Sequence, residues 1–389
     1  MRYVIIGGGI AGTTAAEELR KLDKTGEITL VSEEQHAIYS RVLLPHYIKE
    51  IIPRERVFLK KETWYAEQNI EWLRGELVVE LDGKNKFVRL SSDREIEYDK
   101  LLIATGSAPR TVLDDPRGVS YLRSLDDAEH FIQLMKERET DWKAGIYGGG
   151  FIACEYLNLF AHAGIPTEIA FRGDHFWSNT LTDDAGELIN RHLEKNGVTV
   201  HKQAQFKQIL GDTQLEGFET SKGIHSCQIL GVGIGIDPDI GFLKNTGIEM
   251  GRGILANEFL ETNIPDIYTA GDGSEFYDVI AMRQVNTGNW LNSMTQGRVA
   301  AKNMFGEKTT FELVSSYAAN ALGLDIIFVG DTSKQHAETL EIIGSLEEGG
   351  ITELFIRDNR LVGGVMIGRN QDRKEVTDAI RERRLFQRK

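Results

Sequence analysis

A glycine-rich hexapeptide, GGGIAG at residues 7–12, constrains the fold of this 389-residue chain more than any other feature. It follows a short apolar run at 3–6 and precedes an alanine-rich amphipathic segment that ends near residue 22. A second apolar run follows at 27–31. The order predicts a strand, a tight turn, a helix and a second, parallel strand.

Each part of this turn has a physical reason. Gly7 allows the tight turn, Gly9 lets backbone approach a pyrophosphate, and Gly12 lets the helix pack closely on the strand. The helix N-terminus adds N–H donors and a positive dipole. Glu33 follows the second strand, where a carboxylate accepts hydrogen bonds from a ribose. The segment therefore predicts a dinucleotide site, against the alternative of a purely structural glycine turn.

The same pattern recurs 141 residues later. An apolar run at 144–147 precedes GGGFIA at 148–153, and a helix over 154–163 and a strand over 167–171 are expected to follow. Ala153 replaces the third glycine, which the fingerprint tolerates. Two such loops indicate two dinucleotides, and a protein that holds both most simply passes a hydride between them. The alternative is a duplicated fold with one inactive site.

Composition excludes several other classes of protein. The net charge is −14, from 45 basic and 59 acidic residues, which disfavours nucleic acid and anionic lipid as partners. Two cysteines, Cys154 and Cys227, are too few for a disulfide scaffold or an iron–sulfur cluster, and no metal site is expected. No apolar run reaches the roughly 18 residues that span a bilayer. We expect a reduced, cytoplasmic protein that is a monomer or a homodimer and does not bind membranes.

Several longer segments carry a specific resemblance. They are ITLVSEEQHAIYSRVLLPHYI at 28–48, YDKLLIATGSAPR at 98–110, YLRSLDDA at 121–128, GGGFIACE at 148–155, IYTAGD at 267–272 and WLNSMTQGRVAAKNM at 290–304. Together they resemble the FAD-dependent pyridine nucleotide-disulfide oxidoreductases, and within them the branch of NAD(P)H:rubredoxin, ferredoxin and nitrite reductases. The likeness covers almost the whole chain.

The resemblance implies an α/β fold of two Rossmann-like domains, for FAD and NAD(P), and a small α+β C-terminal domain. We expect the FAD domain at 1–115 and 244–308, the NAD(P) domain at 116–243, and an interface or docking domain at 309–389. In the C-terminal region, short strands at 325–329, 351–357 and 361–367 and a helix at 375–385 are predicted.

The resemblance also assigns roles to residues. Asp272 would bind the flavin ribityl chain, Arg41 and Arg123 the FAD diphosphate or its surroundings, and Trp290 the pyrimidine end of the isoalloxazine. The glycine loops and the resemblance together give these candidate cofactor-binding residues: Gly7, Gly9, Ala11, Gly12, Glu33, Arg41, Val78, Ala104, Thr105, Gly106, Arg123, Gly148, Gly150, Ile152, Arg172, Gly233, Gly235, Gly271, Asp272 and Trp290.

Two residues are candidates for catalysis. Glu155 resembles the family's glutamate beside the nicotinamide and flavin, and His46 stands where many ferredoxin reductases of this branch have lysine. We therefore hypothesise that a His46–Glu155 pair flanks the flavin and tunes it or manages the N5 proton. The choice of nicotinamide stays open, because Arg172 favours NADPH and Asp174 favours NADH.

The chain lacks the redox cysteines of the wider family. Where a thiol would stand beside the flavin, it reads AIYSR at 37–41. Electrons are therefore expected to leave the flavin directly, for rubredoxin, ferredoxin or a partner reductase subunit. The alternatives are an NAD(P)H oxidase or small-molecule reductase, and a non-catalytic protein that senses redox state through FAD and NAD(P)H.

Overall fold

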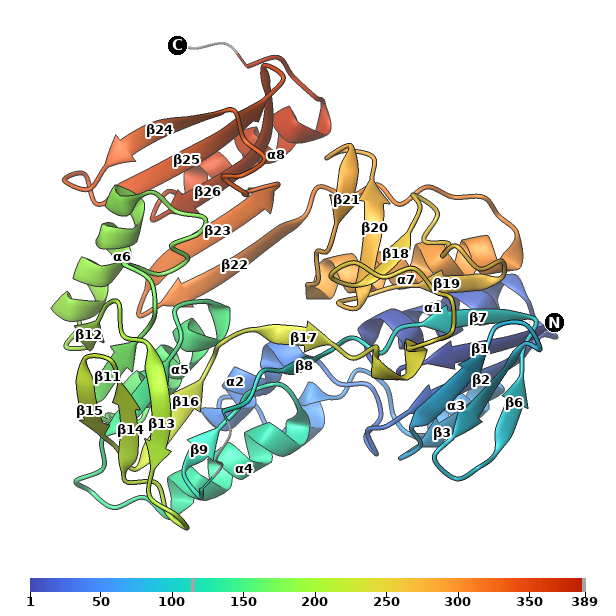
Figure 1. Ribbon diagram of the computed structural model, residues 1–389, viewed down its shortest axis with the longest axis horizontal. Coiled ribbons are helices and arrows are strands. Elements are labelled where there is room, and N and C mark those ends of the chain that lie inside the picture. The colour runs from blue at the N-terminus through green and yellow to red at the C-terminus, as the bar shows by residue number, and fades with distance from the viewer. Residues whose placement is uncertain (113–115, 387–389) are drawn as a thin grey trace. The chain divides into compact units, whose positions relative to one another are not determined.

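The computed structural model describes residues 1–112 and 116–386 (Figure 1). The chain forms two compact units, which are described separately below. The first comprises Met1–Val42, Arg54–Ala108 and Asp237–Ser315, and the second comprises Leu43–Pro53, Pro109–Ile236 and Ser316–Lys389. The predicted division into three domains is finer than this, and it stays a prediction.

The first unit is built on a five-stranded parallel sheet of order β19-β7-β1-β2-β3. Its strands are β1 (Arg2–Ile6), β2 (Glu27–Ser32), β3 (Ile70–Arg74), β7 (Lys100–Ile103) and β19 (Ile267–Thr269). They are short runs of branched apolar residues, as expected for strands covered on both faces. The register sets Ile6 beside Val31 and Ile103, and Ile103 beside Thr269, so four strands end in one row.

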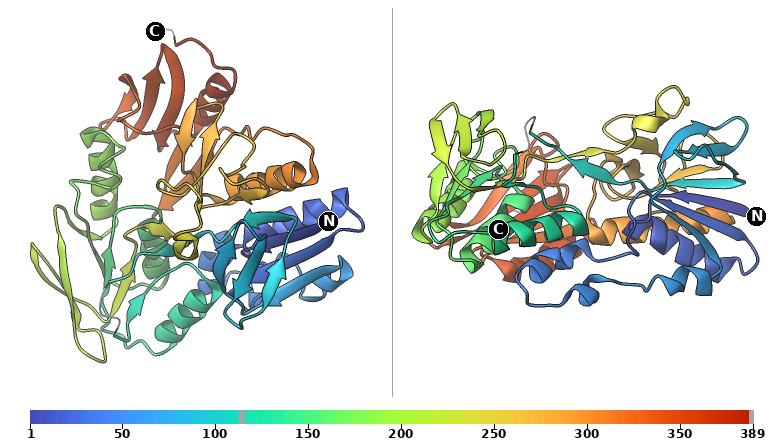
Figure 2. Two further views of the ribbon diagram at one scale, coloured as in Figure 1. Left: turned by 45° about the vertical axis from the view of Figure 1, so that its right-hand side comes forward. Right: turned by 90° about the horizontal axis from the view of Figure 1, so that it is seen from below.

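Helices α1 (Ile10–Leu22) and α7 (Trp290–Phe305) pack against each other in this unit (Figures 1 and 2). The approach is close, because a Cβ built on Gly297 would lie 2.1 Å from the Ala11 carbonyl oxygen. Two smaller sheets complete the unit. They contain β4 (Val78–Asp82), β5 (Phe87–Leu90) and β6 (Glu95–Glu97), and β18 (Ile254–Ala256), β20 (Ser274–Asp278) and β21 (Arg283–Val285).

The remaining first-unit elements are a short helix, two 3-10 turns and a 3-10 segment at the boundary. They are α3 (Thr63–Glu67), η2 (Arg54–Val57), η3 (Gly241–Leu243) and η1 (Arg41–Leu43). The chain passes between the units at five places, after Val42, Pro53, Ala108, Ile236 and Ser315. The third lies within β8 (Ser107–Pro109) and the fourth near the start of β17 (Ile236–Pro238).

The second unit repeats the architecture, with a parallel sheet of order β12-β11-β10-β16-β9. Its strands are β9 (Val119–Ser120), β10 (Ala144–Tyr147), β11 (Thr167–Ala170), β12 (Thr199–His201) and β16 (Ile229–Val232). Four helices accompany it, namely α2 (Leu44–Ile48), α4 (Leu125–Lys136), α5 (Phe151–His162) and α6 (Asp183–Lys195). An antiparallel sheet follows, formed by β13 (Phe206–Leu210), β14 (Gly217–Thr220) and β15 (Gly223–Ser226).

The C-terminal region adds an antiparallel sheet of order β22-β23-β26-β25-β24 to the second unit (Figure 1). Its elements are β22 (Ser316–Ala321), β23 (Leu324–Gly330), β24 (Thr339–Ser345), β25 (Gly350–Arg357), β26 (Arg360–Ile367), η4 (Asn370–Asp372) and α8 (Arg373–Arg381). Helix α8 packs on β23 and β26. Asp358 and Asn359 turn the β25–β26 hairpin with φ of 50° and 55°, the conformation of a tight type I′ turn.

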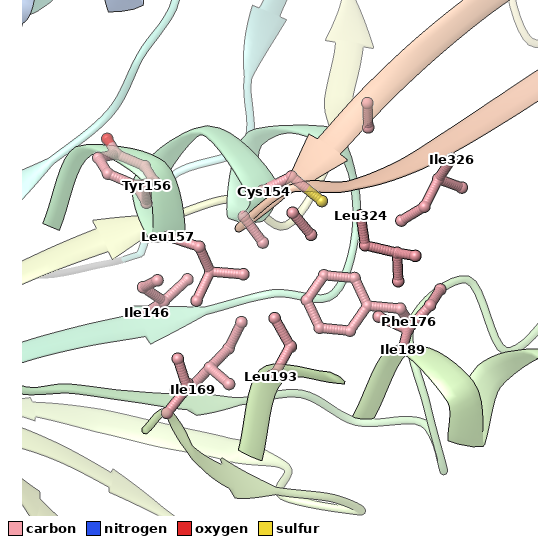
Figure 3. Close-up of a cluster of buried hydrophobic side chains, with 14 of the residues drawn as sticks. Ile146, Cys154, Tyr156, Leu157, Ile169, Phe176, Ile189, Leu193, Leu324 and Ile326 are labelled. Atoms are coloured by element: carbon pink, nitrogen blue, oxygen red, sulfur yellow. The ribbon is translucent and has the colours of Figure 1, made fainter. Parts of the chain in front are cut away.

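The larger apolar core of the second unit joins its parallel sheet to the C-terminal sheet. Cys154, Leu157 and Phe176 lie in the same cluster as Leu324 and Ile326 of β23 (Figure 3). The C-terminal strands therefore bury their apolar face against the nucleotide-binding half of this unit rather than forming a core of their own.

The predicted α/β class with two Rossmann-like sheets is confirmed. The C-terminal strands begin one residue earlier than predicted, and the first of them also ends one residue later. The predicted helix at 375–385 is wrong at both ends, because α8 runs from Arg373 to Arg381. Arg383 has a φ of 52°, and the Arg384 N–H donates to the Ala379 carbonyl, which closes the helix in a left-handed cap.

Candidate functional site

The first glycine loop has the geometry that the fingerprint requires. Gly7 has a φ of +112°, and a Cβ on it would lie 2.2 Å from the Ala104 carbonyl oxygen. A Cβ on Gly12 would lie 1.9 Å from the Gly7 carbonyl oxygen. In contrast, no described atom lies within 4 Å of a Cβ built on Gly9. The protein's own packing therefore requires glycine at Gly7 and Gly12. At Gly9, open space leaves room for a ligand to approach the protein backbone.

Both loops lead into helices that begin without a side-chain cap. The N-cap of α1 is Gly9 and that of α5 is Gly150, and a glycine has no side chain that could accept a helix N–H. The other long helices of the two parallel-sheet regions are capped, because Ser124, Thr182 and Asn289 accept N–H groups of α4, α6 and α7. The first N–H groups of α1 and α5 are thus left for an anion.

Asp272 stands beyond the end of β19, in the row where four strands of the first sheet end. Its carboxylate accepts hydrogen bonds from Ser107 Oγ at 3.1 Å and Ser293 Oγ at 3.4 Å. The preceding Gly271 has a φ of +90°, and its N–H donates to Gln296 Oε1 at 2.7 Å. The Gln296 Nε2 is buried without a hydrogen-bond partner among the described residues. Acidic and amide groups thus line this end of the sheet, as a sugar hydroxyl requires.

Arg41 lies near Asp272 in the same unit and pairs with Glu34. Burial by itself would lower the pKa of the Arg41 guanidinium, but the nearby Tyr39 and the Glu34 carboxylate outweigh it and raise that pKa. Asp272 adds to the same effect. A permanently charged guanidinium that is only 27% exposed is suited to hold a diphosphate.

The other first-unit candidates occupy several positions around the sheet. Glu33 is exposed directly after β2, and Ala104 is buried directly after β7. Thr105 donates its hydroxyl to the Asp239 carbonyl at 2.7 Å. The remaining candidates are Gly106 with a φ of +77°, Trp290 as the first residue of α7, Ala11 in the contact between α1 and α7, and Val78, which is buried in β4.

These residues fit FAD. The ends of β1, β2, β7 and β19 form one edge, and β1 stands where the strand order reverses, which is where open α/β sheets bind ligands. The open space at Gly9 and the uncapped α1 would take the pyrophosphate, and Asp272 and Glu33 would take hydroxyl groups.

The second glycine loop repeats the geometry in the second unit. Gly148 has a φ of +135°, and a Cβ on it would lie 2.1 Å from the Gly233 carbonyl oxygen. A Cβ on Gly150 would meet only Trp177 Nε1, at 3.8 Å. Ile152 packs near Gly233, and Gly235 has a φ of +108°. The loop therefore fits a second dinucleotide, here NAD(P).

Trp177 is a feature of this loop that sequence reasoning missed. Its backbone N–H donates to the Gly149 carbonyl at 3.0 Å, and its φ is +45°, which is unusual for a tryptophan. Its ring meets Phe151 and Phe328 at centroid distances of 5.0 and 5.1 Å. No local pattern marks Trp177, because its place beside the loop depends on the turn after β11.

The residues that choose between NADH and NADPH differ in their surroundings. Asp174 Oδ1 accepts a hydrogen bond from Gln203 Nε2 at 2.6 Å. Arg172 is exposed, and it makes no ion pair with any residue in the described part of the chain. Arg172 is therefore available to a 2′-phosphate, whereas Asp174 is already engaged.

Glu155 and His46 both lie in the second unit, and α2 packs on α4 and α5. Burial raises the pKa of Glu155, and the positive charge of Lys49 partly offsets that rise. The His46 side chain is exposed and makes no hydrogen bond or ion pair with described residues. The cation that acts on Glu155 is thus Lys49, which lies three residues after His46 at the end of α2. Sequence reasoning missed Lys49, although a basic residue one helical turn away was a usable signal.

Arg123 also lies in the second unit, just before α4, where its N–H donates to Asp127 Oδ2 at 2.9 Å. The roles of Arg123, His46 and Glu155 toward a cofactor stay predictions.

The two cysteines are buried core residues. Burial, with a contribution from Glu155, raises the pKa of the Cys154 thiol. Burial raises the pKa of Cys227 to about 12. A thiol whose pKa is raised by burial is a poor nucleophile near neutral pH.

Comparison with known proteins decides the family. The family model of the pyridine nucleotide-disulphide oxidoreductases matches residues 1–297 of this chain. The chain belongs to this family. It is 30% identical over 369 residues to the NADH-rubredoxin oxidoreductase of Clostridium acetobutylicum, covering 94% of this chain and 91% of that one.

Two further comparisons place the chain within the pyridine nucleotide-disulphide oxidoreductases. It is 28% identical to the nitrite reductase [NAD(P)H] of Bacillus subtilis, over 98% of this chain but only 47% of that protein, so it spans about half of that relative. The crystal structure of the NADH:rubredoxin oxidoreductase from C. acetobutylicum matches with a TM-score of 0.83 and 27% identity, covering 100% of this chain and 96% of that chain. The predicted class, an FAD-dependent oxidoreductase that uses NAD(P)H, is confirmed. No helix among the described residues is long and apolar enough to cross a membrane.

Proposed function

We propose that this protein takes a hydride from NAD(P)H on to FAD and passes the electrons to a separate electron-carrier protein or a partner reductase subunit. The observation that carries the proposal is the pair of open, uncapped glycine loops, one in each compact unit, in a chain whose only two thiols are buried. The relative named as an NADH-rubredoxin oxidoreductase supports a protein acceptor.

The first unit would hold FAD. The N–H groups at the start of α1 and the Arg41 guanidinium would bind its diphosphate, and Asp272 would accept hydroxyl groups of its sugar chain. FAD supplies a ring that accepts a hydride and releases electrons one at a time. Ser107 and Ser293 fix the Asp272 carboxylate by hydrogen bonds, so the protein holds this acceptor group in place before the cofactor arrives.

The second unit would hold the nicotinamide cofactor on the α5 N-terminus. Glu155 follows the loop on the first turns of α5, and Lys49 supplies a compensating positive charge. We propose that Glu155 handles a proton during flavin reduction and that Lys49 keeps part of its population ionised. The pair of His46 and Glu155 that was proposed from the sequence stays an alternative, in which His46 takes the place of Lys49 as the partner of Glu155.

A rapid-mixing experiment tests the function. The purified yellow protein is mixed without oxygen with NADH or NADPH, and its flavin absorbance is followed; rubredoxin or ferredoxin is then added. We expect fast bleaching by one nicotinamide and fast recovery with the carrier. Recovery with air alone would replace the proposal by an NAD(P)H oxidase, slow recovery with every acceptor would favour a redox sensor, and a protein that binds no flavin would refute it.

A further inference from the structure

Three side chains far apart in the sequence meet beside the second parallel sheet. Glu168 lies in β11, His201 ends β12, and His225 lies in β15 of the neighbouring antiparallel sheet. Sequence analysis predicts no metal site, and these three residues, separated by 33 and 24 positions, form no short motif. Pairing of β11 with β12, and the fold of β13–β15 beside them, brings them together.

The donor atoms of the three residues converge. His201 Nε2 lies 2.9 Å from Glu168 Oε2, and His225 Nδ1 lies 3.1 Å from the same oxygen. One ligand atom of each residue lies within 4.8 Å of the other two. In a tetrahedral zinc site with bonds of about 2.0–2.2 Å, neighbouring ligand atoms are about 3.4 Å apart. Small side-chain movements would therefore convert this cluster into three corners of a tetrahedron.

The surroundings fix the position of the His225 ring. Its Nε2 lies 2.9 Å from Thr220 Oγ1, and its ring stacks on Phe218 at 4.7 Å with an interplanar angle of 22°. When Nε2–H donates to Thr220, the lone pair of Nδ1 faces Glu168. A metal-binding histidine is commonly fixed in this way by a hydrogen bond from its other ring nitrogen.

Charge favours a cation at this place. In the part of the chain that the structure describes, no lysine or arginine forms an ion pair with Glu168, whose partners are the two histidines. Two imidazoles thus face one carboxylate. That set of two nitrogens and one oxygen is a ligand set for late first-row divalent metals.

We propose that Glu168, His201 and His225 form a binding site for a divalent transition-metal ion of the Zn²⁺ type. The side chains of His201 and Glu168 are 29% and 22% exposed, whereas His225 is 4% exposed. The ion therefore has a path from solvent, and its fourth position is open to water or to an external ligand. The site does not depend on the proposed redox function.

The test is a calorimetric titration with ZnCl₂. The protein with its bound, oxidised FAD is first treated with a chelator, and gel filtration then removes the chelator. The variants are His201→Ala and Glu168→Gln, which change partly exposed side chains. His130→Ala is the matched control, because His130 is an exposed histidine on α4, which packs on β9 at the opposite edge of the sheet from β12. Flavin content and the melting temperature without metal establish that each variant is folded.

We expect one Zn²⁺ per chain in the wild type and in His130→Ala, with at least about tenfold weaker binding in His201→Ala and Glu168→Gln. Thr220→Val keeps the side-chain volume but removes the hydrogen bond to His225, and we expect it to weaken binding by about tenfold. Co²⁺ in place of Zn²⁺ should give visible ligand-field bands that the His201 variant lacks. Equal Zn²⁺ affinity in all variants, or no saturable binding in the wild type, would overturn the proposal.

Discussion

The two glycine loops of this chain have the same strand–turn–helix arrangement, but different residues surround them. In the first loop, a methyl group does not fit at the third glycine, Gly12, and the second glycine, Gly9, faces open space. In the second, Ala153 stands at that third position, and Trp177 faces Gly150. The first loop is followed by exposed, acidic Glu33, and the second by exposed, basic Arg172. The protein's own packing therefore constrains the third position of the first loop more tightly than that of the second.

The largest effect is expected from Gly9→Ala. A Cβ at Gly9 meets no described atom within 4 Å, and its φ of −69° suits any residue, so the variant should fold. The methyl group would occupy the space of the pyrophosphate and cost charge-assisted hydrogen bonds of about 1.5–3 kcal/mol each. We expect FAD affinity to fall by about a hundredfold or more, measured as flavin absorbance per chain after gel filtration. A fully yellow Gly9→Ala protein would place the cofactor elsewhere.

Gly150→Ala is the matched change in the second loop. Its Cβ would touch only Trp177 Nε1, at 3.8 Å, so the fold should again tolerate it. We expect the protein to stay yellow, while the concentration of NAD(P)H needed for half-maximal flavin reduction rises about 10- to 100-fold. Stopped-flow reduction at a series of nicotinamide concentrations measures this. If Gly150→Ala instead lost its flavin, the assignment of one cofactor to each loop would be wrong.

Glu155 and Lys49 sharpen the comparison, because the first loop has no corresponding pair. Glu155→Gln should slow flavin reduction about tenfold if the carboxylate handles a proton. Since Lys49 lowers a pKa that burial has raised, Lys49→Ala should raise the pKa of Glu155 further. The midpoint of the pH profile of flavin reduction would then move to higher pH. His46→Ala is the control, and a shift with His46→Ala but none with Lys49→Ala would restore the pair proposed from the sequence.

The same rise in pKa has a consequence for stability. A buried carboxyl whose pKa is higher in the folded than in the unfolded chain favours folding at low pH, and this contribution is lost as pH rises through the folded-state pKa. Relative to wild type, Glu155→Gln should therefore gain stability as pH rises through that range. Urea unfolding at several pH values, followed by fluorescence, measures the difference.

Arg172→Ala tests the choice of nicotinamide and should have a smaller effect. An exposed guanidinium in contact with a 2′-phosphate contributes roughly 1 kcal/mol, or about a fivefold preference for NADPH. We expect Arg172→Ala to lose that preference in kcat/KM while its activity with NADH is unchanged. The matched change is Gln203→Ala, which removes the hydrogen bond to Asp174 and should raise the preference for NADH. Equal loss with both cofactors would show that Arg172 binds a part that they share.

Sequence reasoning succeeded where the cause was local. Apolar runs and glycine positions fixed both strand–turn–helix units, because those signals act within a few residues. It did not find Trp177, nor the meeting of Glu168 with His201 and His225, since each depends on contacts between distant elements. It also missed Lys49, although the position of this residue one helical turn after His46 was a local signal. It also extended the last helix past Arg381, because the left-handed cap at Arg383 uses a residue with no marked preference for that conformation.

The smallest effect on cofactor binding is expected from Ala153→Gly, which gives the second loop the third glycine of the first. Ala153 is fully buried near the start of α5, so its removal costs helix propensity of about 1 kcal/mol and the burial of one methyl group, about 0.8 kcal/mol. The second unit should thus be destabilised by about 1–2 kcal/mol, seen by urea unfolding, with NAD(P)H affinity nearly unchanged. The reverse change, Gly12→Ala, places a methyl 1.9 Å from a backbone oxygen and should be less well tolerated. If both changes were equally mild, the third position would not set how tightly helix and strand pack, and the difference between the loops would lie in the residues that face the cofactor.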